Sequence, residues 1–118
     1  MRVLLVDDNP DITELLSKFL RAKGYENFVT NDPLVGLEKI KNGHYDVIFL
    51  DIQMPGLSGL DIIQELEIKN ILREQNIIVF STNNFSDSEV DDLLKKEGIA
   101  ACLEKPIQLN DILTVMVK

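Results

Sequence analysis

An unbroken apolar run, VIFL at residues 47–50, ends on Asp51 and is followed within a few residues by Pro55 and Gly56. Four β-forming residues with no polar residue among them are typical of a strand buried on both faces of a parallel sheet. Proline removes a backbone donor and fixes φ, and glycine reaches backbone angles closed to other residues, so a loop is predicted directly after the strand. We therefore expect a central strand that carries Asp51 at its carboxyl end, where ligands bind in open α/β sheets.

Short apolar runs alternate with segments of helical periodicity along the rest of the chain. Further strands are predicted at residues 3–6, 27–30, 77–80 and 99–103. Helix starts are indicated by Asn9-Pro10, Asp32-Pro33, Ser58 with Asp61, and Ser86 with Glu89. Helix ends are indicated by Gly24, Gly43, a break near residue 74, and Gly98. A last helix of about ten residues is predicted to include Leu109, Ile112, Leu113 and Met116. The apolar faces of the first four helices are expected to include Leu15, Leu34, Leu60 and Leu94.

Five strands that alternate with five helices indicate a doubly wound α/β fold, with a parallel sheet, right-handed crossovers and helices on both faces. The chain has 118 residues, of which 45% are apolar, which is enough for one domain covering residues 1–118. Since the carboxyl ends of parallel strands lie along one edge, polar residues that follow the strands should meet there. These residues are Asp7 and Asp8, Asp51, Ser81 and Lys105.

The residues at this edge predict a particular chemistry. Three carboxylates at one site repel one another, and a divalent cation would relieve that repulsion. Oxygen ligands in small number suit Mg2+, whereas a zinc site would need His or Cys ligands. An aspartate beside such a cation can attack phosphorus and form an acyl phosphate. Ser81 could donate a hydrogen bond to a phosphoryl oxygen, and Lys105 could neutralise charge on the group in transfer.

Together these motifs resemble the receiver domain of two-component response regulators, over the whole chain. The resemblance rests on VLLVDD at residues 3–8, IFLDIQMPGLSG at 48–59, IIVFST at 77–82 and EKP at 104–106. It implies a chemotaxis-type, flavodoxin-like sheet with strand order 2-1-3-4-5. It also implies that Asp51 is the phosphoacceptor and that Ser81 and Lys105 bind the phosphoryl oxygens. The implied ligands of Mg2+ are Asp8 and Asp51 directly, Asp7 through water, and the backbone carbonyl of Gln53.

The same resemblance implies partners and an output. A sensor histidine kinase or a histidine phosphotransfer protein would donate the phosphoryl group from a phosphohistidine, and a downstream effector protein or domain would receive the signal. Phosphorylation would shift the conformation of the fourth helix, the fifth strand and the fifth helix. Such a domain is not an enzyme, beyond self-catalysed phosphorylation and dephosphorylation.

Two positions depart from the pattern of the family. Cys102 stands three residues before Lys105, where members usually carry an aromatic ring that moves inward during switching. Thr82, followed by Asn83, stands where Ala or Gly usually follows the hydroxyl residue. The larger side chain of Thr82 is expected to hinder the water that hydrolyses the phosphorylated state, and so to lengthen its lifetime.

Three other functions are compatible with parts of the pattern. An aspartate-nucleophile phosphatase on a similar fold would need a second acid two residues after the first, and Gln53 stands there. A flavin-binding module would need a phosphate loop rich in Ser, Thr or Gly after the first strand, and Asp7 with Asp8 would repel the phosphate. A phosphorylation-independent interaction module would not need the five polar residues at the strand ends.

Charge and composition exclude further functions. The chain has 12 Lys and Arg against 20 Asp and Glu, a formal charge of −8, so we expect neither direct nucleic-acid binding nor attachment to an anionic membrane. The first residues have no apolar core of the kind found in signal peptides, and a single cysteine agrees with a reducing compartment, so a cytoplasmic location is predicted. His44 is expected to be a loop residue and Cys102 a buried small apolar residue.

Overall fold

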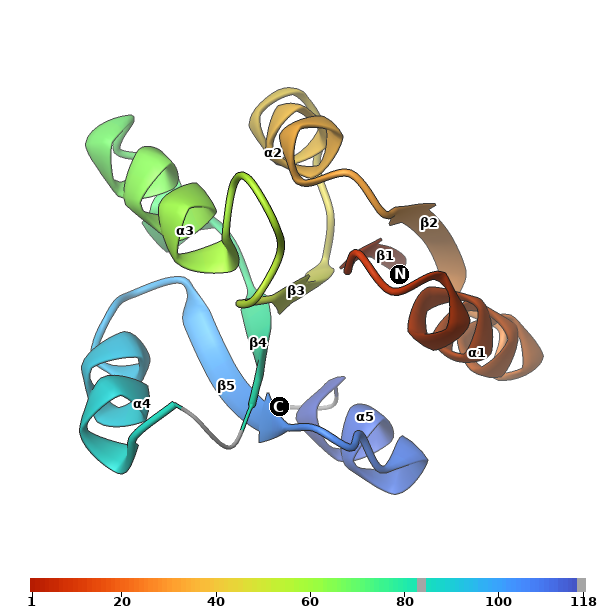
Figure 1. The fold of residues 1–118 in the computed structure, drawn as a ribbon. Coiled ribbons are helices and arrows are strands. Elements are labelled where there is room, and N and C mark those ends of the chain that lie inside the picture. Colours follow the sequence, from red (N-terminus) through yellow and green to blue (C-terminus); the bar gives the residue numbers. More distant parts are fainter. Residues whose placement is uncertain (83–84, 117–118) are drawn as a thin grey trace.

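The computed structural model describes residues 1–82 and 85–116, in which five strands alternate with five α-helices (Figure 1). The strands form one parallel sheet in the order β2-β1-β3-β4-β5. The predicted doubly wound, flavodoxin-like fold and its strand order are therefore confirmed. The elements are β1 (Arg2–Val6), α1 (Pro10–Ala22), β2 (Glu26–Thr30), α2 (Pro33–Asn42), β3 (Val47–Asp51), α3 (Gly59–Ile68), a 3-10 turn η1 (Leu72–Glu74), β4 (Ile77–Ser81), α4 (Asp87–Leu94), β5 (Ile99–Glu104) and α5 (Leu109–Met116).

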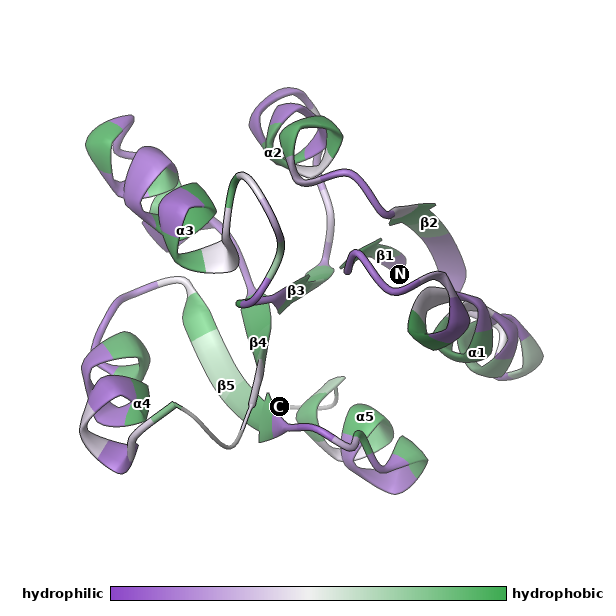
Figure 2. Ribbon diagram, in the orientation of Figure 1, coloured by the Kyte–Doolittle hydropathy of each residue, from purple (hydrophilic) through white to green (hydrophobic). Residues whose placement is uncertain are grey.

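The sheet is the middle of three layers. α1 and α5 cover one face, and α2, α3 and α4 cover the other (Figure 1). On the α1 and α5 side, the rings of Phe49 and Phe80 stack with their centroids 5.5 Å apart. Figure 2 shows apolar residues along the central strands and mixed polarity on the helices. Burial of both faces explains why the central strands are continuous apolar runs rather than alternating ones.

The register of the central strands determines which strand ends meet. All five residues of β3 are buried, and β3 lies between β1 and β4. Val6 is opposite Leu50, so the residues that follow them, Asp7 and Asp51, lie side by side. Asp51 is also opposite Phe80, the residue before Ser81. The register therefore brings the ends of three strands to one short stretch of the edge.

Local capping signals start the helices where they were predicted. The side chain of Asp32 accepts a hydrogen bond from the backbone N–H of Leu34 at the start of α2. Ser58 with Asp61, and Ser86 with Glu89, form the two reciprocal capping boxes of α3 and α4. These caps satisfy backbone donors that the first helical turn leaves free.

Two predicted helix ends were wrong. α3 ends at Ile68 rather than near residue 74, because Asn70 adopts a left-handed φ of 60° that a helix cannot continue through. The following residues form the separate turn η1. α4 ends at Leu94, and Lys95 is its C-cap, so Gly98 with φ of 102° turns the chain toward β5 rather than ending the helix.

Four leucines predicted to face the core are exposed instead: Leu15, Leu34, Leu60 and Leu94. The buried stripe of α1 is formed by Thr13, Leu16, Ser17 and Leu20. Since successive helical residues are about 100° apart, Leu15 points away from a stripe centred on Leu16 and Leu20. The small polar residues of that stripe are satisfied by hydrogen bonds to neighbouring loop and strand residues. None of the helices in the described ranges has the length and apolar character needed to cross a membrane.

Candidate functional site

Three carboxylates lie together at the carboxyl edge of the sheet. Asp7 and Asp8 follow β1, Asp51 ends β3, and each offers a carboxylate oxygen within 4.8 Å of those of the other two. Asp7 and Asp51 are each only 1% exposed, so two of the three acids are held away from bulk water. The convergence predicted from the strand ends is therefore present in the fold.

Lys105 brings a positive charge to the same cluster. Its Nζ lies 3.0 Å from Oδ2 of Asp7 and 3.3 Å from Oδ2 of Asp51. Its backbone N–H donates a 2.8 Å hydrogen bond to the carbonyl of Ser81, so the loop after β5 is anchored to the end of β4. One lysine thereby links the ends of three strands.

The other predicted site residues lie at the same edge. Ser81 is the last residue of β4 and is 5% exposed. The backbone N–H of Gln53 donates to Oδ1 of Asp51 over 3.3 Å, which places the start of the β3–α3 loop against the acidic cluster. The roles assigned to Ser81 and to the carbonyl of Gln53 stay predictions.

The buried charges of this cluster shift the pKa values of one another. Burial, and then the neighbouring charge of Asp7, raise the pKa of Asp51 from 3.8 to about 7, although Lys105 acts in the opposite direction. Burial alone would lower the pKa of Lys105, but the acidic partners Asp7 and Asp51 outweigh it and raise that pKa above its usual value. The cluster therefore has more negative charge than one lysine neutralises.

The donor set fits a hard divalent cation. Oδ2 of Asp7 is buried and accepts no well-aligned hydrogen bond from the described residues, although the ammonium group of Lys105 is near. An acceptor in that position costs free energy unless a further positive charge reaches it. Three carboxylates with oxygen atoms only, open to solvent on the side of Asp8, match the preferences of Mg2+.

A residue that the sequence analysis missed supports the acidic loop. Nδ2 of Asn31 donates to the backbone carbonyl of Asp7 over 2.7 Å and to Oγ1 of Thr13 over 3.0 Å. The backbone N–H of Asn9 donates to Oδ1 of Asp7 over 3.0 Å. Asn31 follows β2, so the rule that found the other polar residues at strand ends could also have found this one.

The residues that depart from the family pattern have different surroundings. Oγ1 of Thr82 is buried and has no hydrogen-bond partner in the described part of the chain, and Asn83 lies outside that part. Cys102 is half-buried on β5 against the hydrophobic core, rather than fully buried as predicted, and burial raises the pKa of its thiol. His44 is exposed in the loop before β3, at the opposite end of that strand from Asp51, as expected for a loop residue.

Comparison with known proteins identifies relatives. The family model for the response regulator receiver domain matches residues 3–117. The polar-differentiation response regulator DivK of Brucella ovis is 31% identical over 107 residues, which cover 91% of this chain and 85% of that protein. Hybrid signal transduction histidine kinase B of Dictyostelium discoideum is 30% identical over an alignment of 126 positions that covers 99% of this chain, but the chain spans only 6% of that protein.

Solved structures have the same fold. The receiver domain of a Francisella response regulator matches with a TM-score of 0.86 at 27% identity, over 98% of this chain and 93% of that one. The receiver domain of a sensor histidine kinase from Pseudomonas aeruginosa, solved with a magnesium ion coordinated in its active-site cleft, matches with a TM-score of 0.79 at 24% identity. That second match covers 98% of this chain and 93% of the kinase domain.

Proposed function

Because the chain belongs to the response regulator receiver domain family, we propose that it is a phosphorylation switch in which Asp51 is the phosphoacceptor. Receiver domains are signalling domains of two-component systems, and they interact with histidine kinases or phosphotransfer proteins and with downstream effectors. The observation that carries the choice of Asp51 is its position, buried at the end of the central strand with its carboxylate near both Asp7 and Lys105.

In the proposed reaction Asp51 acts as a nucleophile in its ionised form. One carboxylate oxygen forms a bond to phosphorus while the P–N bond of the phosphohistidine donor breaks. The electron pair of that bond stays on the imidazole nitrogen, which takes up a proton. Attack of water on phosphorus later restores the carboxylate of Asp51 and releases inorganic phosphate.

Lys105 and Ser81 would bind the transferred group. The ammonium group of Lys105 lies 3.3 Å from Oδ2 of Asp51, so a phosphoryl oxygen attached to Asp51 would be within reach of that charge. Ser81 would donate its hydroxyl proton to another phosphoryl oxygen. The hydrogen bond between the backbone N–H of Lys105 and the carbonyl of Ser81 supports this pairing, because it keeps the two residues together.

Asp7, Asp8 and Asp51, with the backbone carbonyl of Gln53, would hold Mg2+ in this proposal. When bound, the cation neutralises negative charge on the carboxylates and on the phosphoryl oxygens. The buried Oδ2 of Asp7, which lies near Lys105 but accepts no well-aligned hydrogen bond from the described residues, supports such a site, as does the excess of negative charge over Lys105. Loss of the proton from Asp51, whose pKa is about 7, frees its carboxylate both for the cation and for the attack on phosphorus.

The proposed output is a change in α4, β5 and α5. Movement of Ser81 and Lys105 toward the phosphoryl group would act on β5 through the hydrogen bond that joins their segments. A shift of roughly 1 to 3 kcal/mol between two conformations is enough for such a response. Cys102 lies on β5 where a ring is usual, so we propose that repacking of the backbone and neighbouring side chains replaces ring rotation.

The proposed phosphoryl donor is a sensor histidine kinase or a histidine phosphotransfer protein, and the proposed recipient of the signal is an effector protein or domain. A direct role in nucleic-acid binding is not part of the proposal, because the formal charge of −8 opposes it. We propose a cytoplasmic location, with which the single cysteine agrees.

The decisive experiment is incubation with acetyl phosphate and Mg2+, followed by intact mass spectrometry. Wild-type protein should gain one phosphoryl group, and Asp51→Asn should gain none. The matched control is Asp92→Asn, an exposed aspartate on α4 outside the cluster, which should react like the wild type. Equal incorporation by wild type and Asp51→Asn would reject Asp51 as the acceptor.

A further inference from the structure

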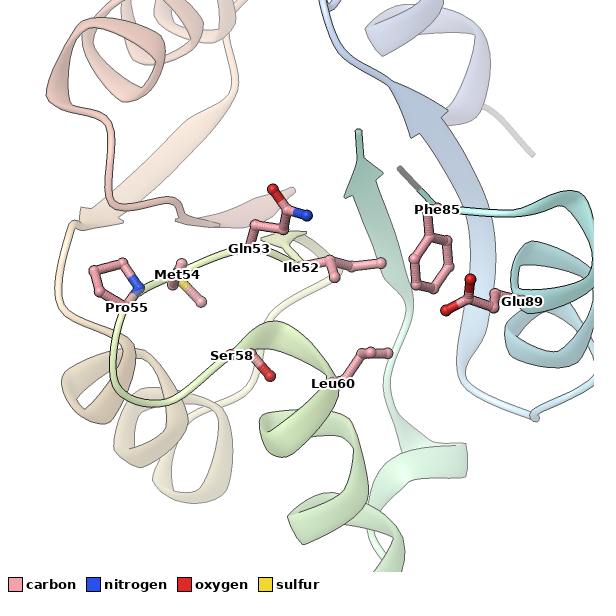
Figure 3. Close-up of a pocket in the computed structure, with 8 residues that line it drawn as sticks. All are labelled: Ile52, Gln53, Met54, Pro55, Ser58, Leu60, Phe85 and Glu89. Atoms are coloured by element: carbon pink, nitrogen blue, oxygen red, sulfur yellow. The ribbon is translucent and has the colours of Figure 1, made fainter. Parts of the chain in front are cut away.

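An open groove of about 560 Å³ lies beside the acidic site, and of its lining residues only Gln53, through its backbone carbonyl, has a role in the binding of Mg2+ and of the phosphoryl group proposed above. Its walls come from the β3–α3 loop, the start of α3, and the start of α4 (Figure 3). In Figure 3, Ile52 and Leu60 extend from one wall toward Phe85 and Glu89 on the other. The lining residues that form this surface are Ile52, Met54, Pro55, Leu60, Phe85 and Glu89.

The interior of the groove is mainly apolar. Ile52 and Met54 are buried at its base, and Phe85 is half-buried against the core. Leu60 is 39% exposed, although the helical pattern alone predicted that it faces the core. A partly exposed leucine beside a half-buried aromatic ring and a proline offers a surface that one inserted apolar side chain could cover.

The surroundings of the groove are strongly acidic. The two flanking helices, α3 and α4, contain seven acids and no Lys, Arg or His within their bounds. Two lysines just after α4 are paired with acids of these helices: Lys96 lies 2.8 Å from Glu67, and Lys95 lies 4.0 Å from Asp92. Two of the seven negative charges are therefore paired, and five remain. The seven acids are Asp61, Glu65 and Glu67 on α3, and Asp87, Glu89, Asp91 and Asp92 on α4.

We propose that the α3–α4 groove docks a basic, amphipathic segment of a partner protein, with an apolar side chain inserted against Leu60 and Phe85. Lysine or arginine residues of that segment would lie over the acids of α3 and α4. A second copy of this chain would present the same acidic helices and be repelled. Nucleic acid and anionic lipid are disfavoured for the same reason. Charge complementarity thus selects one class of occupant.

This docking goes beyond the phosphorylation switch, since its contacts are apolar and electrostatic and do not include the Asp51 carboxylate. Binding is therefore expected with unphosphorylated protein and also with Asp51→Asn. That expectation separates the two proposals: failure of Asp51 as an acceptor would leave docking intact, and failure of docking would leave phosphorylation intact.

The test uses a short fluorescent helical peptide with lysine on one face and leucine on the other, titrated with the whole domain and followed by fluorescence anisotropy. The peptide should bind, and its affinity should fall as salt is added. Leu60→Gln should weaken binding by about five- to tenfold, the effect expected from losing one partly buried leucine. Ile68→Gln is the matched control, because Ile68 is also exposed on α3 but does not line the groove, and it should bind like the wild type.

Charge is tested separately. Glu89→Gln keeps a side chain able to form the capping box of α4 and should weaken binding of the lysine peptide. A peptide with the same lysines but its leucines scattered around the helix should bind more weakly than the amphipathic one. The proposal would be overturned if a peptide with glutamate in place of the lysines bound as tightly as the lysine peptide. It would also be overturned if Leu60→Gln bound the lysine peptide with unchanged affinity and had the circular dichroism spectrum of the wild type. Self-association of the domain through this face would overturn it too.

Discussion

The ammonium group of Lys105 lies 3.3 Å from Oδ2 of Asp51, although Asp51 ends β3, Lys105 follows β5, and these two strands do not pair with each other. β4 separates β5 from β3, and the carbonyl of Ser81 at the end of β4 accepts the backbone hydrogen bond of Lys105. The lysine therefore reaches across one strand to neutralise a carboxylate in the central one. We therefore expect the stability of the domain to depend on the protonation of Asp51, on Mg2+, and on the presence of both Lys105 and Asp51.

The Mg2+-free domain should lose stability as pH rises through the range between 3.8 and about 7, because the folded state holds a proton on Asp51 that the unfolded chain releases earlier. Asp51→Asn removes this effect and should be more stable than the wild type at about pH 8.5, by at most roughly 4 kcal/mol. Near pH 4 that advantage should disappear. Urea unfolding with a chelator at both pH values measures the difference; an advantage independent of pH would contradict the assignment.

Mg2+ should stabilise the wild-type domain, because a ligand that binds only the folded state raises the free energy of unfolding, by about 2.7 kcal/mol at 100 times its dissociation constant. Asp8→Asn should lose most of this gain, since it removes one of the three carboxylates. Asp11→Asn, an exposed acid in the first turn of α1, is the control and should keep the gain. Thermal unfolding with and without Mg2+ measures the gain in stability. Equal gains in Asp8→Asn and Asp11→Asn would argue against the site.

The elements and the site could be predicted for physical reasons that are local in the sequence. Apolar runs identify strands buried on both faces, and capping boxes such as Ser58 with Asp61 satisfy donors within one helical turn. The convergence of the site residues on one edge followed from the parallel topology. The strand order that places Asp7 beside Asp51 was implied by the resemblance to receiver domains.

The features that were not predicted depend on the packed structure. Leu60 belongs to the apolar pattern of α3, but the position of α4 leaves it at the mouth of a groove. Asn31 supports Asp7 through a hydrogen bond between residues that are 24 positions apart in the sequence. The pKa of Asp51 near 7 results from burial and from the distance to Asp7, and neither can be read from spacing along the chain.

Lys105→Met should destabilise the Mg2+-free domain by about 1 to 3 kcal/mol above pH 7, because it leaves the carboxylates of Asp7 and Asp51 without their cation. Adding Asp51→Asn should recover much of the loss, since the double variant contains one buried acid fewer. Lys95→Met, at an exposed pair 4.0 Å from Asp92, should change stability by no more than about 0.5 kcal/mol. Urea unfolding of the wild type, Lys105→Met, Asp51→Asn and the double variant gives the coupling energy between the two residues, and strictly additive losses would contradict it.

Variants of Thr82 can distinguish how the bulk of its side chain and how its hydroxyl group affect the lifetime of the phosphorylated state. Its Oγ1 is buried without a partner in the described structure, so Thr82→Val should be neutral or slightly stabilising while it keeps the volume of the side chain. If bulk hinders the hydrolytic water, Thr82→Val should retain the phosphorylated lifetime of the wild type. Thr82→Ala should shorten it by roughly three- to tenfold, the effect of about 1 kcal/mol on a barrier.

Loss of the phosphoryl group, followed by intact mass after removal of acetyl phosphate, measures all three lifetimes. A short lifetime in Thr82→Val would assign the effect to the hydroxyl group instead, and equal lifetimes in all three proteins would show that Thr82 does not control access of water.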